Sequence, residues 1–380
     1  MASQEGQRGG CLPAERDALD RPQFCVPVPE LAKALGLKPG DPAEVAKAIY
    51  GLLRGPNLWV FGAVFTHLRE HGWIQCYTDP CMWRLFDQDD QLVGETIVHI
   101  DDFLLGGDES SSTFRKAEKA LLDAWEWSPW ETGSFRSTGI DLRQLDSGEI
   151  RLDQDDYLNH IDPIEISAAR RREKNAKTTD REKSALRALL GALLWPANLT
   201  MPKLSAAISQ LQNKIPTSTV ETLQEANKWL AKARADEHTT LIIHAFEQNE
   251  PLVMLEWTDA SWANRVDLAS TGGKISGLAP ITIKDGKTVP VALFYWQCEK
   301  LKRKCRSSLA AEVQEMANAE QDLYFNRLMW ADVGLGRRLD LSEPTTDVLQ
   351  VPAFILIDAK SIYDSMHGAS GPLEMSEKRT

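Results

Sequence analysis

The sequence predicts a mixed fold of helices and strands, of the α/β or α+β class, in a chain of two domains. The chain has 380 residues, more than one ordinary domain needs and enough to bury two cores. Its hydrophobic content of 43% and charged content of 26% are typical of globular proteins. The spacing of apolar residues changes several times between a helical period and the period of two that strands show. The chain is therefore expected to fold, with both kinds of element present.

The spacing of apolar residues in the first half of the chain predicts helices and a hairpin. Residues 1–40 are punctuated by Pro and Gly and predict no regular fold. Apolar spacing predicts helices over 41–52 (stopped by Gly55-Pro56), 58–68 and 114–125. A period of two predicts strands over 82–86, 95–100 and 103–106. The last two strands meet at Asp101-Asp102, so we expect a hairpin with two carboxylates at its tip.

In the second half, short strands to about residue 161 and a charged linker to about residue 183 precede a helical region over 184–235. Strands are then predicted over 252–258, 273–283 and 289–297. A helix capped by Ser307 or Ser308 follows, with one broad apolar face formed by Leu309, Val313, Met316, Tyr324 and Leu328. A strand over 353–358 leads into a short helix. Three strands, a helix, a strand and a helix indicate an α/β arrangement.

Composition limits the partners and the compartment. The net charge of −12 argues against a protein that binds nucleic acid over its whole surface, although local basic patches can still bind it. Two basic runs qualify, around Arg170–Lys177 and Lys300–Arg306, and a solvated loop is the alternative for each. The longest uncharged stretch, 188–202, is shorter than a membrane span, and the first twenty residues do not form a secretory signal. We expect an intracellular protein that binds no membrane, whose six cysteines are reduced packing residues.

Three acidic residues in the second half predict a metal site. Strand alternation places Asp259 and Asp358 on the same face as the apolar residues two and four positions before them. A carboxylate there is costly unless it has a partner. Glu312, in the first turns of the Ser307 helix, could reach the two strand ends. The set fits a divalent cation that activates water for phosphodiester hydrolysis. The alternative is that each carboxylate only ends or caps its own element.

The pair Asp101-Asp102 is a second candidate. Two adjacent carboxylates at a hairpin tip would point at a common spot where a hard cation such as Mg²⁺ could bind. Because Asp is also a favoured turn residue, a solvated turn is the alternative.

The context of this hairpin resembles the reverse transcriptase of copia-type retrotransposons. The motifs occur in that family's order and together span most of residues 45–215: Ala48-Ile49-Tyr50-Gly51-Leu52 with Gly55-Pro56 and Trp59, Asp79-Pro80-Cys81, His99-Ile100-Asp101-Asp102, Ser137-Thr138-Gly139-Ile140-Asp141, and Leu190-Gly191-Ala192-Leu193-Leu194-Trp195 with Ala197-Asn198 and Pro202. His99 stands where the family usually has Tyr. The family's third polymerase carboxylate is expected at or before residue 1, and Asp17 and Asp20 are the only early alternatives. The resemblance therefore implies little or no polymerase activity from this chain alone.

The last third is similar to the ribonuclease H segment of the same elements. The matching motifs are Thr258-Asp259-Ala260-Ser261-Trp262-Ala263, Ser270-Thr271-Gly272-Gly273, Trp296, Ser307-Ser308-Leu309-Ala310-Ala311-Glu312 and Ile357-Asp358-Ala359-Lys360-Ser361. By resemblance, Asp259, Glu312 and Asp358 match the first three catalytic carboxylates, and Glu377-Lys378-Arg379-Thr380 matches the stretch before the fourth. Lys302, Arg303, Lys304 and Arg306 would contact phosphate, which fixes position rather than sequence.

The resemblance implies four segments: an irregular segment over 1–40, a partial palm-like reverse transcriptase domain over 41–165, a charged linker and helical connection over 166–247, and a ribonuclease H-like domain over 248–380. It implies Mg²⁺, or Mn²⁺, at Asp259, Glu312 and Asp358 and at Asp101 and Asp102. The expected partner is an RNA–DNA hybrid or a primer–template, besides other parts of a parent polyprotein. Cleavage of the hybrid's RNA strand is the implied activity. An inactive relic or a nucleic-acid-binding scaffold is the alternative.

Overall fold

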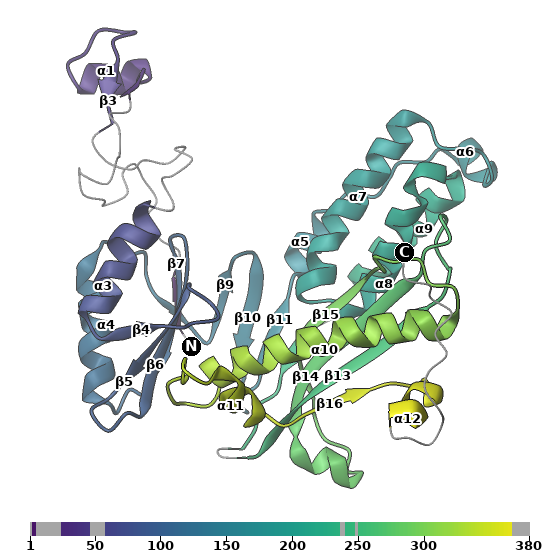
Figure 1. Cartoon of the computed structure of the whole chain (residues 1–380). Coiled ribbons are helices and arrows are strands. Elements are labelled where there is room, and N and C mark those ends of the chain that lie inside the picture. Colours follow the sequence, from purple (N-terminus) through teal and green to yellow (C-terminus); the bar gives the residue numbers. More distant parts are fainter. Residues whose placement is uncertain (1, 5–23, 46–57, 236–239, 248–249, 367–380) are drawn as a thin grey trace. The chain divides into compact units, whose positions relative to one another are not determined.

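A computed structural model describes residues 2–4, 24–45, 58–235, 240–247 and 250–366. It consists of two compact units, the first formed by Met1–Thr138 with Asp332–Leu339 and the second by Gly139–Ala331 with Asp340–Thr380. Each unit combines helices with β-sheet (Figure 1), so the predicted mixed class is confirmed. Across the described ranges, no helix combines the length and the apolar character that crossing a membrane requires.

The first unit contains a six-stranded sheet in the order β4-β5-β6-β7-β1-β8, with every neighbouring pair antiparallel. Its strands are β1 (Ala2–Gln4), β4 (Trp73–Gln75), β5 (Met82–Phe86), β6 (Leu92–His99), β7 (Asp102–Gly107) and β8 (Glu131–Thr132). The predicted hairpin is confirmed as β6 and β7, whose turn lies between His99 and Asp102.

One core holds this sheet to its helices. The π-helical turn η2 (Leu58–Val64) runs directly into α3 (Phe65–Glu70), and α4 (Ser112–Ala124) begins at a Ser111 side chain that accepts from the Phe114 N–H. Phe65, Trp83 and Phe114 are buried together here. The glycines Gly94 and Gly107 are needed because a Cβ at either would lie within 2.6 Å of the Phe114 ring. Trp125, Trp127 and Trp130 pack against this core.

The remaining elements of the first unit correct two predictions. They are β2 (Phe24–Cys25), α1 (Pro29–Ala34), β3 (Ala43–Glu44) and β9 (Ser134–Ser137). The described part of 1–40 is thus not wholly irregular. The helix predicted from Asp41 is wrong at its start, since Ala43–Glu44 pairs with β2. Pro42 explains this in part, because the residue before a proline disfavours helical geometry. The rest of that helix, with Tyr50 and Gly55-Pro56, lies outside the described residues.

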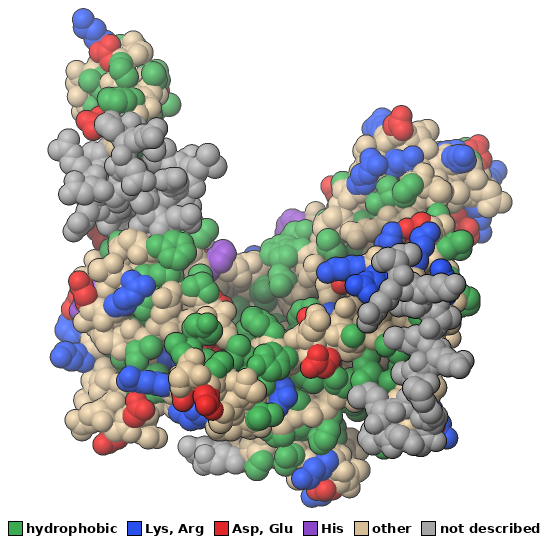
Figure 2. Space-filling view, viewed as in Figure 1, with side chains coloured by type: hydrophobic (Ala, Val, Ile, Leu, Met, Phe, Trp, Pro, Cys, Tyr) green, Lys and Arg blue, Asp and Glu red, His purple; other side chains and the backbone are tan. Residues whose placement is uncertain are grey.

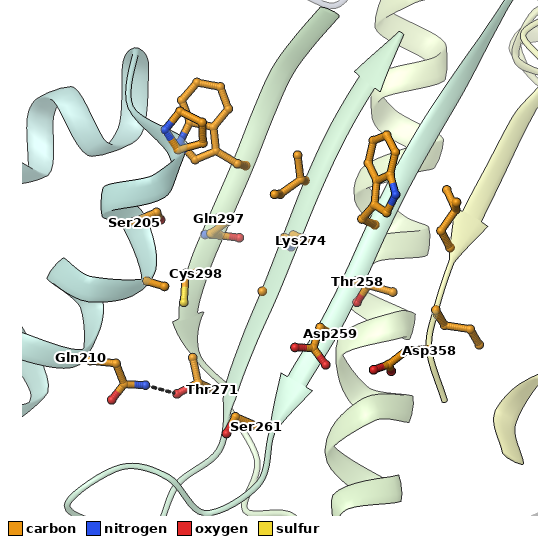
Figure 3. A pocket seen from close by; sticks show the side chains of 18 of the residues that line it. Ser205, Gln210, Thr258, Asp259, Ser261, Thr271, Lys274, Gln297, Cys298 and Asp358 are labelled. Carbon is orange, nitrogen blue, oxygen red and sulfur yellow. Dashed lines mark hydrogen bonds between the residues drawn. The ribbon is translucent and has the colours of Figure 1, made fainter. Parts of the chain in front are cut away.

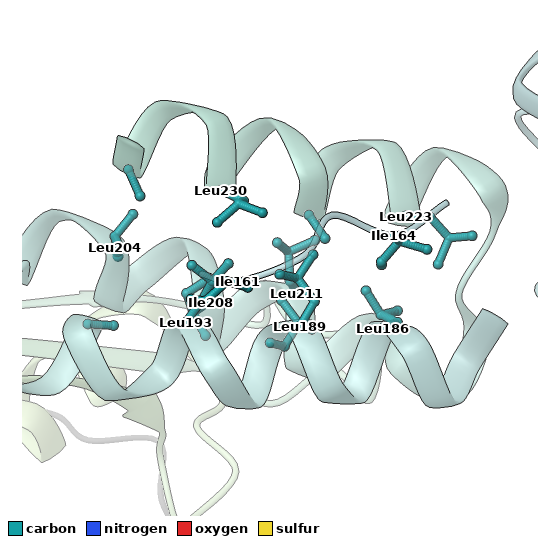
Figure 4. Close-up of a cluster of buried hydrophobic side chains, with 14 of the residues drawn as sticks. Ile161, Ile164, Leu186, Leu189, Leu193, Leu204, Ile208, Leu211, Leu223 and Leu230 are labelled. Carbon is teal, nitrogen blue, oxygen red and sulfur yellow. The ribbon is translucent and has the colours of Figure 1, made fainter. Parts of the chain in front are cut away.

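The second unit begins with three neighbouring antiparallel strands, β10 (Ile140–Gln144), β11 (Ile150–Asp153) and β12 (Leu241–Ile243). Its helices are α5 (Asp155–Asn159), α6 (Ala168–Arg172), α7 (Asp180–Leu199), α8 (Pro202–Lys214), the 3₁₀ turn η3 (Ile215–Thr217) and α9 (Val220–Ala235). Their leucines and isoleucines interlock in one core (Figure 4). The predicted helical region over 184–235 is confirmed, divided into three helices, with Pro202 at the first turn of α8, where a missing N–H costs nothing.

A four-stranded sheet carries the candidate site. Its strands are β13 (Leu252–Ser261), β14 (Thr271–Pro280), β15 (Ala292–Lys300) and β16 (Ala353–Leu356), in the order β15-β14-β13-β16, and only β16 runs parallel to its neighbour. Helix α10 (Ser308–Val333) lies across this sheet (Figure 1), and α11 (Pro344–Leu349) and α12 (Lys360–Met366) flank β16 in sequence. The predicted element order is confirmed. The strand predicted to reach residue 283 ends at Pro280, which has no N–H for the ladder, and η4 (Ile281–Asp285) follows.

The buried face of α10 differs from the predicted apolar face. Ala311, Glu315, Ala319 and Leu323 are buried, whereas Tyr324 is 42% exposed. Small residues let the helix approach the sheet closely: a Cβ at Gly272 would lie 2.1 Å from the Glu315 carboxylate. Apolar periodicity fails here because alanine and buried polar side chains occupy most of the buried face, and Leu323 is the large hydrophobic residue among those named.

The motifs at Gly139 and Trp195 contact each other, which gives a test of the fold. Gly139 has φ +78°, and a Cβ there would lie 2.4 Å from the Trp195 ring, which packs edge-on against Tyr157. We expect Gly139→Ala to lower the free energy of unfolding by about 2–4 kcal/mol, from left-handed strain and ring overlap. Urea unfolding measures this. In a Trp195→Phe background the same substitution should cost about half as much; an equal cost in both backgrounds would contradict the contact.

Candidate metal centre

The register of two strands brings the two aspartates together. Parallel pairing sets Met254 beside Ala353 and Trp257 beside Leu356, where the ladder ends. Asp259 and Asp358 each lie two residues beyond this last pair. Asp259 lies near the end of β13, and Asp358 follows β16 by two residues. Figure 3 shows the two side chains pointing toward one another at the edge of a cavity. The strand pairing thus brings the two segments side by side just before the two aspartates.

Helix α10 contributes the third carboxylate. The Ser307 hydroxyl accepts from the Ala310 N–H at 3.1 Å and fixes where the helix begins. Five residues later, Glu312 Oε2 accepts a 3.1 Å hydrogen bond from the backbone N–H of Ala260, next to Asp259. Glu312, Asp259 and Asp358 each offer an oxygen, and these oxygens lie within 4.8 Å of one another. Among the residues described, no other group of three or more His, Cys, Asp or Glu side chains is as close.

The electrostatics of this cluster favour a cation. Burial raises the pKa of Glu312 to about 7, and repulsion from Asp259 and Asp358 adds to the rise. A group of carboxylate oxygens, part exposed and part buried, is the ligand set that hard divalent cations prefer. Binding a cation would offset the repulsion that otherwise keeps a proton on Glu312. The residues therefore fit a divalent metal, although their role as ligands stays a prediction.

A cavity of about 650 Å³ adjoins the aspartates within the second unit. One wall is α8, with Ser205 and Gln210, and the other is the face of β13–β15 (Figure 3). Gln210 Nε2 donates to Thr271 Oγ1 at 3.0 Å and closes one end. Sequence patterns do not reveal the α8 wall, because Ser205, Ala206 and Gln210 are polar or small and belong to none of the matched motifs.

A polar network lies between α10 and the sheet. Glu256 is fully buried, and its Oε2 accepts from Ser276, while its Oε1 has no hydrogen-bond partner among the described residues. Lys274 forms an ion pair with Asp322 of α10, and Asn326 Nδ2 donates to Ser276 Oγ at 3.2 Å. Burial raises the pKa of Glu256 to about 7. Sequence reasoning missed this network, although strand alternation does place Glu256 on the face opposite Asp259.

The hairpin of the first unit places its aspartates differently. His99 pairs with Asp102, so Ile100 and Asp101 form the turn. Ile100 has φ +58°, which a β-branched residue rarely adopts and which costs on the order of 1–3 kcal/mol. In the described part of the chain, Asp101 and Asp102 do not belong to a group of three acidic side chains within metal-binding distance. Asp17, Asp20 and the stretch 377–380 lie outside the described residues.

The two basic runs have different surroundings. Arg170 pairs with Glu173 at 2.7 Å and Glu182 at 2.9 Å, so this residue holds α6 to the start of α7. Figure 2 shows several Lys and Arg side chains on the surface around α6 and α7. Lys302, Arg303, Lys304 and Arg306 are exposed in the connection between β15 and α10, directly before the helix that carries Glu312.

No disulfide joins the cysteines that the structure describes.

Comparison with known proteins identifies no family. No protein-family profile matches the chain, and no curated protein sequence matches it. Solved structures of the foamy viral protease-reverse transcriptase are similar to it at low identity. The dRH form in complex with double-stranded DNA has 15% identity and a TM-score of 0.46 over 84% of this chain and 52% of that one. The complex with double-stranded DNA has 14% identity and a TM-score of 0.46 over 89% and 57%. The complex with an RNA/DNA hybrid has 14% identity and a TM-score of 0.42 over 90% and 42%. The chain thus spans about half the length of these proteins.

Removing one carboxylate should weaken metal binding. We expect Asp259→Asn and Glu312→Gln each to reduce Mn²⁺ affinity by about 10-fold or more, because each removes one of three anionic ligands. Titration calorimetry measures the change. Asp285→Asn, at an exposed carboxylate of η4, is the matched control and should bind as the unaltered chain does. Equal affinity in all four proteins would contradict a metal centre at these residues.

The buried Glu256 should give stability a defined pH dependence. Its pKa rises from 4.5 to about 7 on folding, so its contribution is fully present below pH 4.5 and is lost as the pH rises through about 7. In the unaltered chain, the free energy of unfolding should therefore be lower at about pH 8 than at about pH 5, by about 3 kcal/mol on account of Glu256. Urea unfolding at the two pH values should show that this difference disappears in Glu256→Gln. Glu320→Gln, on the exposed side of α10, should leave the loss in place. An unchanged pH dependence in Glu256→Gln would show that the carboxyl ionises freely.

Proposed function

We propose that the second unit hydrolyses the RNA strand of an RNA–DNA hybrid at a two-metal centre formed by Asp259, Glu312 and Asp358. The observation that carries this proposal is the convergence of three carboxylates, one from β13, one from just after β16 and one from α10, with oxygens within 4.8 Å of one another. Bound Mg²⁺ or Mn²⁺ ions would activate water and stabilise the leaving oxygen of a phosphodiester. The cavity beside Asp259 offers room for the strand that is cut.

The chain's own residues would position the substrate and the ligands. Pairing of β13 with β16 up to Trp257 and Leu356 would bring Asp259 and Asp358 together, and the Ala260 N–H would orient Glu312. Before a cation binds, burial and the two neighbouring aspartates raise the pKa of Glu312 and favour a proton there. Binding of a cation would release that proton. Lys302, Arg303, Lys304 and Arg306 would contact phosphates beside the site. The 2′-hydroxyl and the minor-groove shape would mark the RNA strand.

We further propose that the chain derives from a copia-type retrotransposon, in which residues 41–165 form a partial, palm-like reverse transcriptase domain. The ordered motifs from Asp79 to Trp195 support this origin. The four-segment division and the metal-binding role of Asp101 and Asp102 belong to the same proposal. Because two-metal catalysis needs several carboxylates, and this pair belongs to no group of three in the described part of the chain, we expect little or no polymerase activity from the chain alone.

Cleavage of a labelled RNA–DNA hybrid tests the ribonuclease proposal. In Mg²⁺ or Mn²⁺ the purified chain should cut the RNA strand, and Asp259→Asn and Glu312→Gln should each slow the reaction by about 100-fold or more, equal to about 3 kcal/mol in the barrier. Asp285→Asn should cut at the normal rate. If the folded chain binds the hybrid without cutting it, a nucleic-acid-binding scaffold or an inactive relic is the better description.

A further inference from the structure

Two loops meet beside the metal centre. The hairpin loop, residues 262–270, joins β13 to β14, and the cationic loop, residues 301–306, joins β15 to α10. The Trp262 indole N–H donates to the Cys305 carbonyl at 2.9 Å, and the Leu301 N–H donates to the Ser270 carbonyl at 3.0 Å. Lys300 and Asp267 add an ion pair at the base of the two loops. These contacts make the two loops one continuous surface.

Trp262 is the exposed aromatic residue of this surface. It is 48% exposed, and no other tryptophan is among the exposed large hydrophobic residues of the described part of the chain. Its one polar atom already donates to Cys305, so the exposed area is apolar ring. Exposed aromatic surface is unfavourable in water, and a ring held by a hydrogen bond loses little further entropy when a ligand stacks on it.

The hairpin loop is held in one conformation. Arg265 is buried, its Nε donates to Thr271 Oγ1 at 3.0 Å, and its guanidinium also donates to Ser209 of α8 at 2.8 Å. The Ala263 N–H donates to Ser270 Oγ at 3.1 Å. Ala263 and Leu268 have φ +49° and +59°, which non-glycine residues adopt only when their surroundings impose it. The loop therefore presents Trp262 on a rigid support.

The position of Trp262 links it to the chemistry of the site. It lies three positions after Asp259, a distance of about 10 Å along a strand. Its partner Cys305 lies two residues before Ser307, which caps the helix that carries Glu312. The cationic loop supplies exposed Lys302, Arg303, Lys304 and Arg306 on the same surface. Proteins that bind single-stranded nucleic acid combine cationic side chains, which contact the phosphates, with aromatic rings, on which the bases stack. Both kinds of side chain occur on this surface.

We propose that Trp262 is a stacking platform for an unpaired nucleobase, so that the preferred substrate is a hybrid with a single-stranded extension at the site. This inference rests on the proposed function. A paired base inside a duplex is stacked on both faces, whereas a base in an extension or at a junction has a free face. The alternative occupant of an exposed apolar ring is a protein partner, but four flanking cations favour a polyanion.

The test compares binding of two hybrids, one blunt and one with a short single-stranded extension that carries 2-aminopurine. Fluorescence anisotropy in a metal chelator gives the affinities without cleavage. The unaltered chain should prefer the extended hybrid, and Trp262→Leu should lower that affinity by about 10-fold while binding the blunt hybrid normally. Trp262→Phe, which keeps a ring but not the N–H, should retain most of the preference. The 2-aminopurine emission should change on binding, and Trp262→Leu should abolish the change.

Controls separate stacking from charge and from folding. Phe325→Ala, at another exposed aromatic residue of the second unit, should bind as the unaltered chain does. Lys302→Gln with Lys304→Gln should weaken both hybrids and reduce the salt dependence of binding, whereas Trp262→Leu should leave that dependence unchanged. Equal binding of the extended hybrid by Trp262→Leu and the unaltered chain would overturn the platform. If Trp262→Leu lost affinity equally for both hybrids and had a lower melting temperature, Trp262 would have only a structural role, and the platform proposal would again be overturned. Failure of the proposed function would instead appear as absent cleavage, with these binding differences intact.

Discussion

The parallel pairing of β16 with β13 is the constraint on which the candidate site depends. The last pair of this ladder, Trp257 with Leu356, lies two residues before Asp259 in one segment and two residues before Asp358 in the other. The hydrogen bond from the Ala260 N–H to Glu312 then ties α10 to the same strand end. A slip of one residue in the strand pairing would turn a carboxylate to the other face of the sheet, because side chains alternate along a strand. Three elements distant in sequence thus share one point through backbone geometry.

This convergence has an electrostatic cost that shapes the surroundings. Burial and two neighbouring aspartates raise the pKa of Glu312 to about 7, and burial does the same for Glu256 on the opposite face of β13. The sheet therefore carries ionisable groups on both faces. Between α10 and the sheet, the protein supplies its own cation: Lys274 forms an ion pair with Asp322. At Asp259 and Asp358 a bound metal ion would take the place of such an internal cation. The three-carboxylate cluster, and not the network beneath the helix, is therefore the candidate for chemistry.

Sequence reasoning predicts what local pattern and motif can specify. The β6–β7 hairpin, the helical region over 184–235 and the order of elements around β13 follow from apolar spacing and turn residues. The three carboxylates are predicted as a set, and the structure brings them within reach of one another. The features that sequence reasoning misses depend on tertiary contacts. The close approach of α10 to the sheet depends on small residues such as Gly272 and Ala311, and β3 forms where β2 pairs with it. Trp262 belongs to a matched motif, but only the structure reveals that its ring is exposed.

The central claim is that Asp259, Glu312 and Asp358 together hold divalent cations. Crystals grown with Mn²⁺ and measured at the manganese absorption edge test it directly, because anomalous scattering locates each ion. The account predicts anomalous peaks within about 2–2.5 Å of carboxylate oxygens from all three residues, with two ions about 3.5–4 Å apart. Peaks elsewhere on the second unit, with these carboxylates bound only to protein or water, would contradict it.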